Sequence, residues 1–431
     1  MEIARISVTL IVSRLGEMIA SLFYFAFVGH FIVDSLSHAS LAWALVSFLT
    51  VVGIGFFSIL MVNVAGSTDL NASGVALDLN VSFRYAFLFG VFIAAGVLLY
   101  VLNTWNSSAA NDNSIGLEVL LIFSLSTPAI YIQIIIFNFF NAIKQIKYEL
   151  LYTWTFNVAV VAMGAILVLT DMDSNIIYFV SAYVVLRWLL VVVAFIFFSR
   201  IIHRYIFRFR YLQSIQRATY ADYFYKGLPL ALCFGGESLL FFILSFVSKS
   251  LGDVSLSAYQ ASLHFLSIVY MISIGVGNAA GIIVARHYVL KEFSLLRKTY
   301  FQGLKFGFVI LTPVLLVCFF FNENVSLFYT SDEAIRRLIE SNILISIPFL
   351  VFEYVYIVTR MTLRSMEDVW VPTLFTISSL NILGVVFSVC LLSFYEYSVR
   401  SIFIALVFCS FILMLFLFFR LGTILEKHGT R

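Results

Sequence analysis

The chain has 431 residues, of which 62% are hydrophobic and only 11% are charged, and its mean hydropathy is +1.03. Soluble domains carry about 25% charged residues, so this composition excludes a soluble globular protein and predicts an all-α protein of the lipid bilayer. The net charge is +3 and all four cysteines lie inside apolar runs, so we expect no nucleic-acid partner, no disulfide and no cysteine metal site.

Apolar runs long enough to cross a bilayer, which takes about 20 residues, recur along the chain. Six precede residue 200 and six follow residue 226. They lie near residues 7–31, 40–65, 81–103, 117–142, 149–171, 174–199, 227–248, 256–285, 301–321, 337–362, 370–394 and 398–423. Backbone polar groups inside lipid must pair within the protein, so each run is predicted to be a helix.

The two sets of six are related by an internal repeat. Residues 9–58 align with residues 229–278 without a gap, at a constant offset of 220 that is close to half of the chain. The matched positions include Gly16-Glu17 with Gly236-Glu237, Ile54-Gly55 with Ile274-Gly275, Ser126-x-Pro128 with Ser346-x-Pro348, and Gln133 with Glu353. A repeat of this length in a membrane chain is typical of a transporter built from two related halves.

We therefore predict twelve transmembrane helices in two pseudo-symmetric six-helix bundles. The N-lobe comprises residues 1–199 and the C-lobe residues 227–431, and the basic segment 200–226 is a linker that contacts anionic lipid headgroups. Lys and Arg gather on the linker side of the helices, which predicts that both termini are cytoplasmic in a plasma membrane, expected to be a bacterial inner membrane. The positive residues expected on the other side are mixed with acids, and they are Lys249, Arg336, Arg337 and Arg400.

Ionisable side chains are rare inside the predicted helices, because each costs about 2.5–3.5 kcal/mol at the bilayer centre. Glu237 and Glu353 both lie near the middle of a predicted helix of the second half. Two carboxylates in a cavity of low dielectric cannot both stay ionised without a counter-charge, so we expect this pair to bind a proton or a cation such as Na+. The alternative is a pair of structural acids that are hydrogen-bonded to neighbouring helices.

The first half has one acid and one amide at the corresponding positions. Glu17 is the repeat mate of Glu237, and Gln133 is the repeat mate of Glu353. Two interpretations of Glu17 stay open: it shares in ion coupling, or it forms a local ion pair with Arg14 on one helix face.

Two further ionisable residues fall inside predicted helices. Arg187 is expected either to pair with an acid or to line a wet cavity. His264 either titrates near neutral pH or serves as a packed, hydrogen-bonded group. The sequence contains no phosphate-binding Gly loop followed by Lys and Ser or Thr, no His-Glu-x-x-His and no Cys-x-x-Cys, so neither an enzyme nor a directly ATP-driven pump is predicted.

Several short motifs occur in a specific order. They are Val28-Gly29-His30, Gly227-Leu228-Pro229-Leu230, Ala258-Tyr259-Gln260-Ala261-Ser262-Leu263, Gly275-Val276-Gly277-Asn278-Ala279-Ala280, Phe352-Glu353 and Leu363-Arg364-Ser365-Met366-Glu367-Asp368-Val369-Trp370-Val371-Pro372. With this order and spacing, the chain resembles the MATE family of multidrug and toxin extrusion transporters, in particular its NorM-like branch. The likeness extends over essentially the whole chain.

The resemblance implies a V-shaped pair of bundles, alternating access, and efflux of organic cations in exchange for Na+ or H+. The acids that form the cation site in the NorM-like pattern match Glu237 and Glu353 here. The Pro and the downstream Asp that are common in the family's first helix are replaced by Thr9 and Tyr24, which weakens the expectation of a proton site in the N-lobe. Asn157 stands at the first of two polar positions that are usual in the fifth helix.

We therefore expect a secondary-active exporter, a Na+ or H+ antiporter for small organic cations, that works as a monomer among membrane lipids without a cofactor. The expected ion-coupling residues are Glu237, Glu353 and Glu17. The candidates for the substrate cleft are Gln133, Asn157, Gln260, His264, Arg187 and Tyr24. Three alternatives stay open: a flippase for a lipid-linked saccharide, a non-transporting receptor or scaffold, and a channel.

Overall fold

The structure is a computed structural model, and it describes residues 2–66, 73–105, 110–143, 145, 147–170, 175–205, 216–366, 368, 370–395 and 397–429. Over these residues the chain is helical and contains no strand. In chain order the elements are α1 (Glu2–Phe31), η1 (Val33–Ser35), α2 (Leu36–Gly66), α3 (Ser73–Trp105), α4 (Ala110–Ser124), α5 (Thr127–Ala142), α6 (Lys147–Leu169), α7 (Ile176–Tyr205), α8 (Arg217–Ser250), α9 (Asp253–Val289), α10 (Phe293–Phe320), α11 (Asn322–Tyr329), α12 (Glu333–Ile345), α13 (Ile347–Ser365), α14 (Trp370–Thr376), the π-helix η2 (Ile377–Leu383), α15 (Gly384–Phe394) and α16 (Val399–Gly429).

Each predicted membrane span coincides with a helix or with a set of consecutive helical segments. In the described part of the chain, nine spans are long and apolar enough to cross a bilayer, and two bent helix pairs raise the number to 11. The bent pairs are Thr219–Gly236 with Ser238–Ser250, and Glu333–Ile345 with Ile347–Ser365. The remaining predicted span falls on α1, whose apolar stretches are Ile3–Val12 and Met18–Phe31. The prediction of an all-α membrane fold is confirmed.

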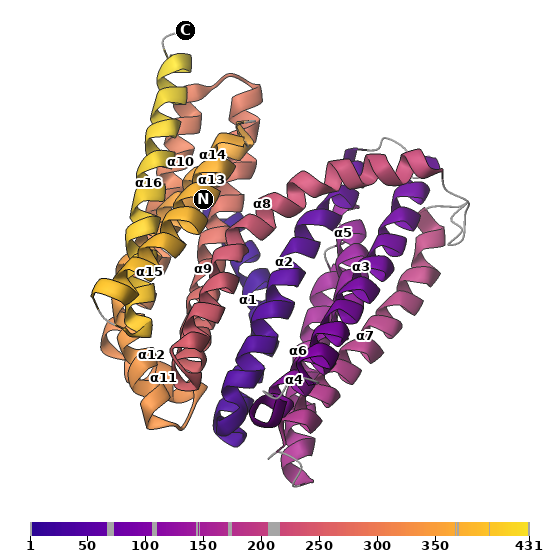
Figure 1. Cartoon of the computed structure of the whole chain (residues 1–431). Helices are drawn as coiled ribbons and strands as arrows, with labels where there is room; N and C mark the ends of the chain where they lie inside the picture. The colour runs from indigo at the N-terminus through magenta and orange to yellow at the C-terminus, as the bar shows by residue number, and fades with distance from the viewer. Residues whose placement is uncertain are drawn as a thin grey trace. The chain divides into compact units, whose positions relative to one another are not determined.

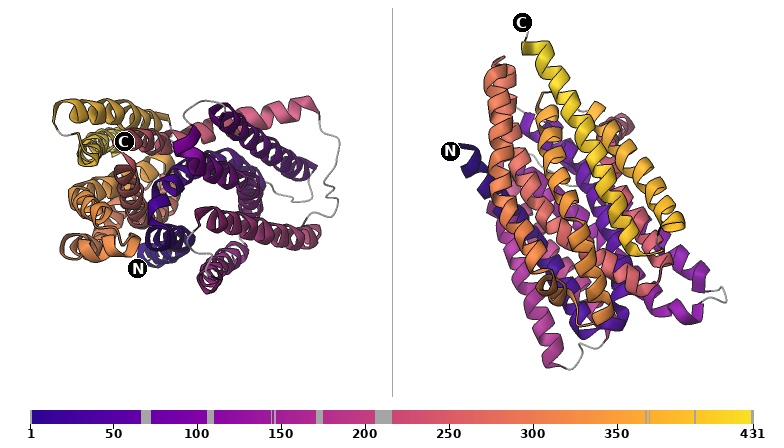
Figure 2. Two further views of the ribbon diagram at one scale, coloured as in Figure 1. Left: turned by 60° about the horizontal axis from the view of Figure 1, so that its bottom comes forward. Right: turned by 90° about the vertical axis from the view of Figure 1, so that its left-hand side faces the viewer.

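The chain divides into two compact units. The larger unit consists of Met1–Val33 and Leu239–Arg431, and thus contains α1, the second half of α8 and α9 to α16. Its central helix is α9, which packs against α13, α1, α10 and α12, while α16 packs against α13 and α15. The long helices α9, α10, α13 and α16 run side by side, and α16 ends at the same end of this unit where α10 begins (Figures 1 and 2).

The smaller unit consists of Asp34–Ser238, which covers α2 to α7 and the first half of α8. Helices α2 and α3 both pack against α4 and α5, and α7 packs against α4, α5 and α6. Helices α2, α3, α5 and α7 run roughly along one direction in this unit (Figure 1). The predicted lobes are residues 1–199 and 227–431, and they keep each first helix with its own repeat. In the compact units, α1 groups with residues 239–431 and the first half of α8 groups with residues 34–238.

The first helix of each repeat packs against a helix of the other repeat at matched positions. A methyl group added at Gly275 of α9 would lie 2.4 Å from Cγ1 of Ile11 in α1, and one added at Gly55 of α2 would lie 2.5 Å from the carbonyl oxygen of Leu230 in α8. The same methyl at Gly55 would lie 2.9 Å from Cα of Ala231. Gly55 matches Gly275 and Ala231 matches Ile11 at the offset of 220. Each first helix therefore packs closely against the second helix of the other repeat, as small residues in membrane helices allow.

One predicted span in each half is interrupted at a matched position of the repeat. Ser126 precedes α5 and Ser346 precedes α13, and each of these helices holds a proline in its first turn. Proline is tolerated there because the first N–H groups of a helix have no partner within the helix. The hydroxyls donate to the preceding turn, at 2.7 Å from Phe123 O and from Asn342 O, respectively. In the larger unit the chain bends by 50° at this break, between α12 and α13.

Candidate functional site

Glu353 is the predicted coupling residue whose side chain the structure describes. It lies on α13, a helix that packs against α9, α16 and α10, and only 5% of it is exposed. Its neighbour Tyr354 donates to the carbonyl oxygen of Gly303 in α10 at 2.8 Å, and the hydroxyls of Tyr300 and Thr359 are 2.8 Å apart. These bonds fix α13 against α10, so the carboxyl group of Glu353 sits on a rigid helix.

The environment of Glu353 makes a permanent negative charge costly. Burial removes a carboxylate from water, and the group then stays neutral or binds a positive partner. The side chains of Glu17 and Glu237, the other two predicted coupling residues, lie outside the described residues, as does that of Arg14. The proposed pairing of Glu237 with Glu353 therefore stays a prediction.

His264 of α9 connects three segments of the larger unit. Its Nε2 is 2.8 Å from the hydroxyl of Ser21 in α1, and its Nδ1 is 2.9 Å from the hydroxyl of Tyr329 in α11. Ser21 uses its proton to donate to Met18 O at 2.8 Å, so it accepts from Nε2–H, and Nδ1 accepts from Tyr329. Burial raises the pKa of Tyr329, so this donor keeps its proton. The arrangement favours a neutral, hydrogen-bonded His264.

The other two candidates in the larger unit are also buried. Gln260, one turn before His264 on α9, donates to the Ser245 hydroxyl at 2.7 Å, and Tyr24 of α1 is fully buried. The ring of Phe25, next to Tyr24, lies 4.9 Å from the His264 ring, centroid to centroid. The structure thus groups His264 with α1 and α11 and gives Gln260 a separate internal partner.

The smaller unit holds Gln133, Asn157 and Arg187 on α5, α6 and α7, which pack against one another. Asn157 is buried, and the amide oxygen of Gln133 is buried without a hydrogen-bond partner among the described residues. Arg187 Nη2 donates to the Tyr183 hydroxyl at 3.0 Å, and its guanidinium carbon lies 4.7 Å from the centroid of the Phe156 ring. This is the geometry of a cation–π contact.

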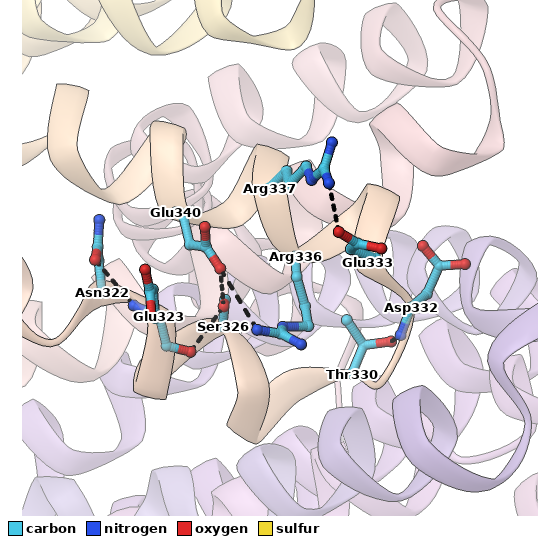
Figure 3. Close-up of polar contacts among 9 residues, drawn as sticks. All are labelled: Asn322, Glu323, Ser326, Thr330, Asp332, Glu333, Arg336, Arg337 and Glu340. Atoms are coloured by element: carbon cyan, nitrogen blue, oxygen red, sulfur yellow. Dashed lines mark hydrogen bonds and ion pairs between the residues drawn. The ribbon is translucent and has the colours of Figure 1, made fainter.

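A polar cluster closes one end of the larger unit, where α11 meets α12 (Figure 3). The hydroxyl of Ser326 lies 2.7 Å from Oε1 of Glu340, and Arg336 Nη2 lies 4.0 Å from the same oxygen. Arg337 pairs with Glu333 on the exposed side of α12. Each arginine thus has an acid four residues away. The cluster therefore contains two arginine–acid pairs, and the described residues hold no group of three or more His, Cys, Asp or Glu side chains that could bind a metal.

Several residues around the candidates were not predicted from the sequence. Ser21 and Tyr329 are far from His264 in the sequence, so only the packing of α1 and α11 brings them to the imidazole. Tyr183 could have been found, because it lies one helical turn before Arg187. Phe156 could not be distinguished from the many other Phe residues of the chain.

The fold and its buried polar groups define the class of protein: a helical membrane protein with the architecture of a MATE transporter. A solved inward-facing MATE transporter of the MOP superfamily matches with a TM-score of 0.82, at 16% identity over 96% of each chain. The chain is 21% identical over 225 residues to a probable multidrug resistance protein NorM of Bacillus thuringiensis, covering 52% of this chain and 49% of that protein. It is 25% identical over 153 residues to NorM of Aliivibrio fischeri, covering 36% and 33%.

A family model also matches part of the chain. The MatE family model matches residues 229–390, and the chain is similar to proteins named NorM in sequence and to a solved MATE transporter in fold. The matched part spans about half the length of the Bacillus relative.

Proposed function

We propose that this protein is a secondary-active exporter of small organic molecules, driven by antiport of Na+ or H+ and working by alternating access. The observation that carries the proposal is the buried carboxyl group of Glu353 on a helix fixed to its neighbour. An acid in this setting binds a proton or a cation readily and releases it when its surroundings become wet. The names of the relatives, multidrug resistance proteins, support a small-molecule cargo.

The proposed coupling step uses the two acids of the second half. A proton or Na+ neutralises Glu353, with Glu237 as its expected partner, and so removes the cost of a buried negative charge. The neutral and the charged states of the acids favour different arrangements of the helices. Binding and release of the ion are thereby coupled to the movement of the substrate. The protein's own helices supply the site, so no bound cofactor takes part in this proposal.

The proposed orientation has both termini and the 200–226 linker in the cytoplasm. Three positive residues that fall on the opposite side each have an acid four residues away. Lys249 pairs with Asp253, Arg336 lies near Glu340, and Arg337 pairs with Glu333. The orientation itself rests on the excess of Lys and Arg on the linker side, because acids contribute little to the positive-inside rule.

The test is transport by the full chain in proteoliposomes. A fluorescent organic dye should be moved against its own concentration gradient when a Na+ jump or a pH jump is applied, and an ionophore that dissipates the driving gradient should stop the movement. Movement only down the dye gradient, unaffected by the ionophore, would point to a channel. Absence of movement with intact dye binding would favour a receptor, and both outcomes would reject the antiport proposal.

A further inference from the structure

Arg187 is a positive charge held deep inside the smaller unit. It lies near the middle of the span Ile176–Ile202, and the structure leaves its side chain half-buried. Its guanidinium carbon is 4.7 Å from the centre of the Phe156 ring and 5.4 Å from that of Tyr183. Charged residues at this depth are costly and mark substrate or ion pathways, so a role beyond packing is expected.

The hydrogen bonds around Arg187 are incomplete among the described residues. One bond, from Nη2 to the Tyr183 hydroxyl at 3.0 Å, connects it to the protein. Its Nε–H is buried without an acceptor, and the buried hydroxyl of Tyr152 also has no partner. The Tyr152 ring is stacked on Phe156 with 6.3 Å between centroids and 10° between planes, and Tyr152 interacts electrostatically with Arg187. Two donors thus lie beside the same ring and lack acceptors.

The charge balance points in the same direction. Arg187 forms no ion pair with a described acid. Glu149, the acid on the neighbouring helix α6, accepts a hydrogen bond from Asn141. Buried donors that are left without acceptors cost about 1–3 kcal/mol each, and a carboxylate or phosphate oxygen would satisfy both while neutralising the guanidinium.

We propose that Arg187 and Tyr152 bind the single anionic group of a substrate: a carboxylate, sulfonate or phosphate on a molecule with an apolar or aromatic body. The inference rests on the proposed export function and names the substrate class that this site selects. The buried rings of Phe156 and Tyr183 make the surroundings of the guanidinium aromatic, which suits an apolar or aromatic body. One guanidinium balances one negative charge, so an anion with several charges, such as a pyrophosphate, is a poor fit.

The test is equilibrium binding, measured by fluorescence anisotropy, of a matched pair of probes to the purified full chain. The probes are a xanthene dye with a free benzoate carboxylate and the methyl ester of the same dye. The protein is held in nanodiscs of zwitterionic lipid, which carry no net negative headgroup. The wild type should bind the carboxylate form more tightly, and Arg187→Gln should weaken that binding about tenfold, since charged hydrogen bonds are worth about 1.5–3 kcal/mol.

The ester form supplies the internal control. Arg187→Gln should leave its affinity within about twofold, whereas a general disturbance of the bundle would weaken both dyes. Arg337→Gln removes the same charge from an exposed position and should change neither affinity. Equal losses for the two dyes in Arg187→Gln, or no loss for either, would overturn the proposal.

Two milder variants keep the test informative if Arg187→Gln does not fold. Arg187→Lys keeps the charge but not the planar fork, and Tyr152→Phe removes one hydroxyl; both should weaken the carboxylate dye selectively, by about two- to fivefold. If neither variant weakened binding of the carboxylate dye, the proposal would be rejected. Because binding needs no ion gradient, failure of ion-driven export with the dye preference intact would reject the antiport alone. Full displacement of the carboxylate dye by phosphatidylglycerol would assign the anion site to a lipid headgroup instead and overturn the substrate assignment.

Discussion

Replacing Gly29 by Ala should separate α1 from α11 and destabilise the larger unit. A methyl group at Gly29 would lie 1.8 Å from the carbonyl oxygen of Tyr329 and 2.9 Å from its carbonyl carbon. The obstacle is backbone, which cannot rotate away, so one segment must move by about 1 Å or more. Overpacking of this kind costs about 1–3 kcal/mol. The movement would also disturb the bond from Ser331 N to Gly29 O, at 3.3 Å, and the contact of His30 Nε2 with Phe328 O, at 3.2 Å.

The measurement is the unfolding free energy of the purified protein, obtained by titration from a mild detergent into a denaturing one. Gly96→Ala in α3 is the matched control, because a methyl group there meets nothing within 4 Å. Alanine is the better helix former by about 0.5–1 kcal/mol, so the control should be neutral or stabilising. If Gly29→Ala were as stable as the control, the close packing of α1 on α11 would be wrong.

Three further predictions concern the repeat and the buried polar groups. Gly55→Ala and Gly275→Ala should each lower the unfolding free energy by about 1–3 kcal/mol in the same titration, and a loss at only one of them would contradict the equivalence of the two contacts. His264→Ala should remove the hydrogen-bond partner of the buried Tyr329 hydroxyl, while Ser21 keeps its bond to Met18 O, and should cost about 1–3 kcal/mol; its effect should be the same at pH 6 and pH 8, since the hydrogen bonds of His264 favour the neutral imidazole, and a marked pH dependence would argue for a titrating residue. If Glu17 couples, Glu17→Gln should lower proteoliposome transport and Arg14→Gln should not restore it, whereas rescue of yield and transport by the double change would establish a local ion pair.

Much of the helical framework could be predicted because lipid allows few solutions. A run of about 20 apolar residues must be a helix, and the offset of 220 relates the two halves directly. Small residues allow close packing of membrane helices, and the structure shows such contacts at Gly53, where an added methyl group would lie 2.3 Å from Tyr131, and at Gly275, where it would lie 2.4 Å from Ile11.

The packing partners of the helices could not be predicted in the same way. A membrane helix is apolar both where it contacts lipid and where it contacts other helices. Its hydropathy therefore does not indicate which helices it packs against, and the grouping of α1 with residues 239–431 could not be predicted. The short helix α11 was also missed, because its eight residues fall between two predicted spans. The π-helical segment η2 lies inside a span that the sequence predicts as a single helix.

The candidate site was predictable only residue by residue. Buried acids and an arginine inside apolar runs are visible in a sequence because their insertion is costly, which is how Glu353 and Arg187 were found. Their partners come from helices that are distant in the sequence. Tyr152 lies 35 positions before Arg187, on a different helix, and nothing in the local pattern relates the two residues.

The most direct test of the proposed function compares wild type with Glu353→Gln in proteoliposomes under an imposed Na+ or H+ gradient. The amide keeps the shape of the side chain and removes the group that binds the ion. The wild type should move a fluorescent organic dye against its gradient, and Glu353→Gln should bind the same dye and remain folded but fail to move it. Undiminished ion-driven export by Glu353→Gln would contradict the coupling role of this carboxyl group.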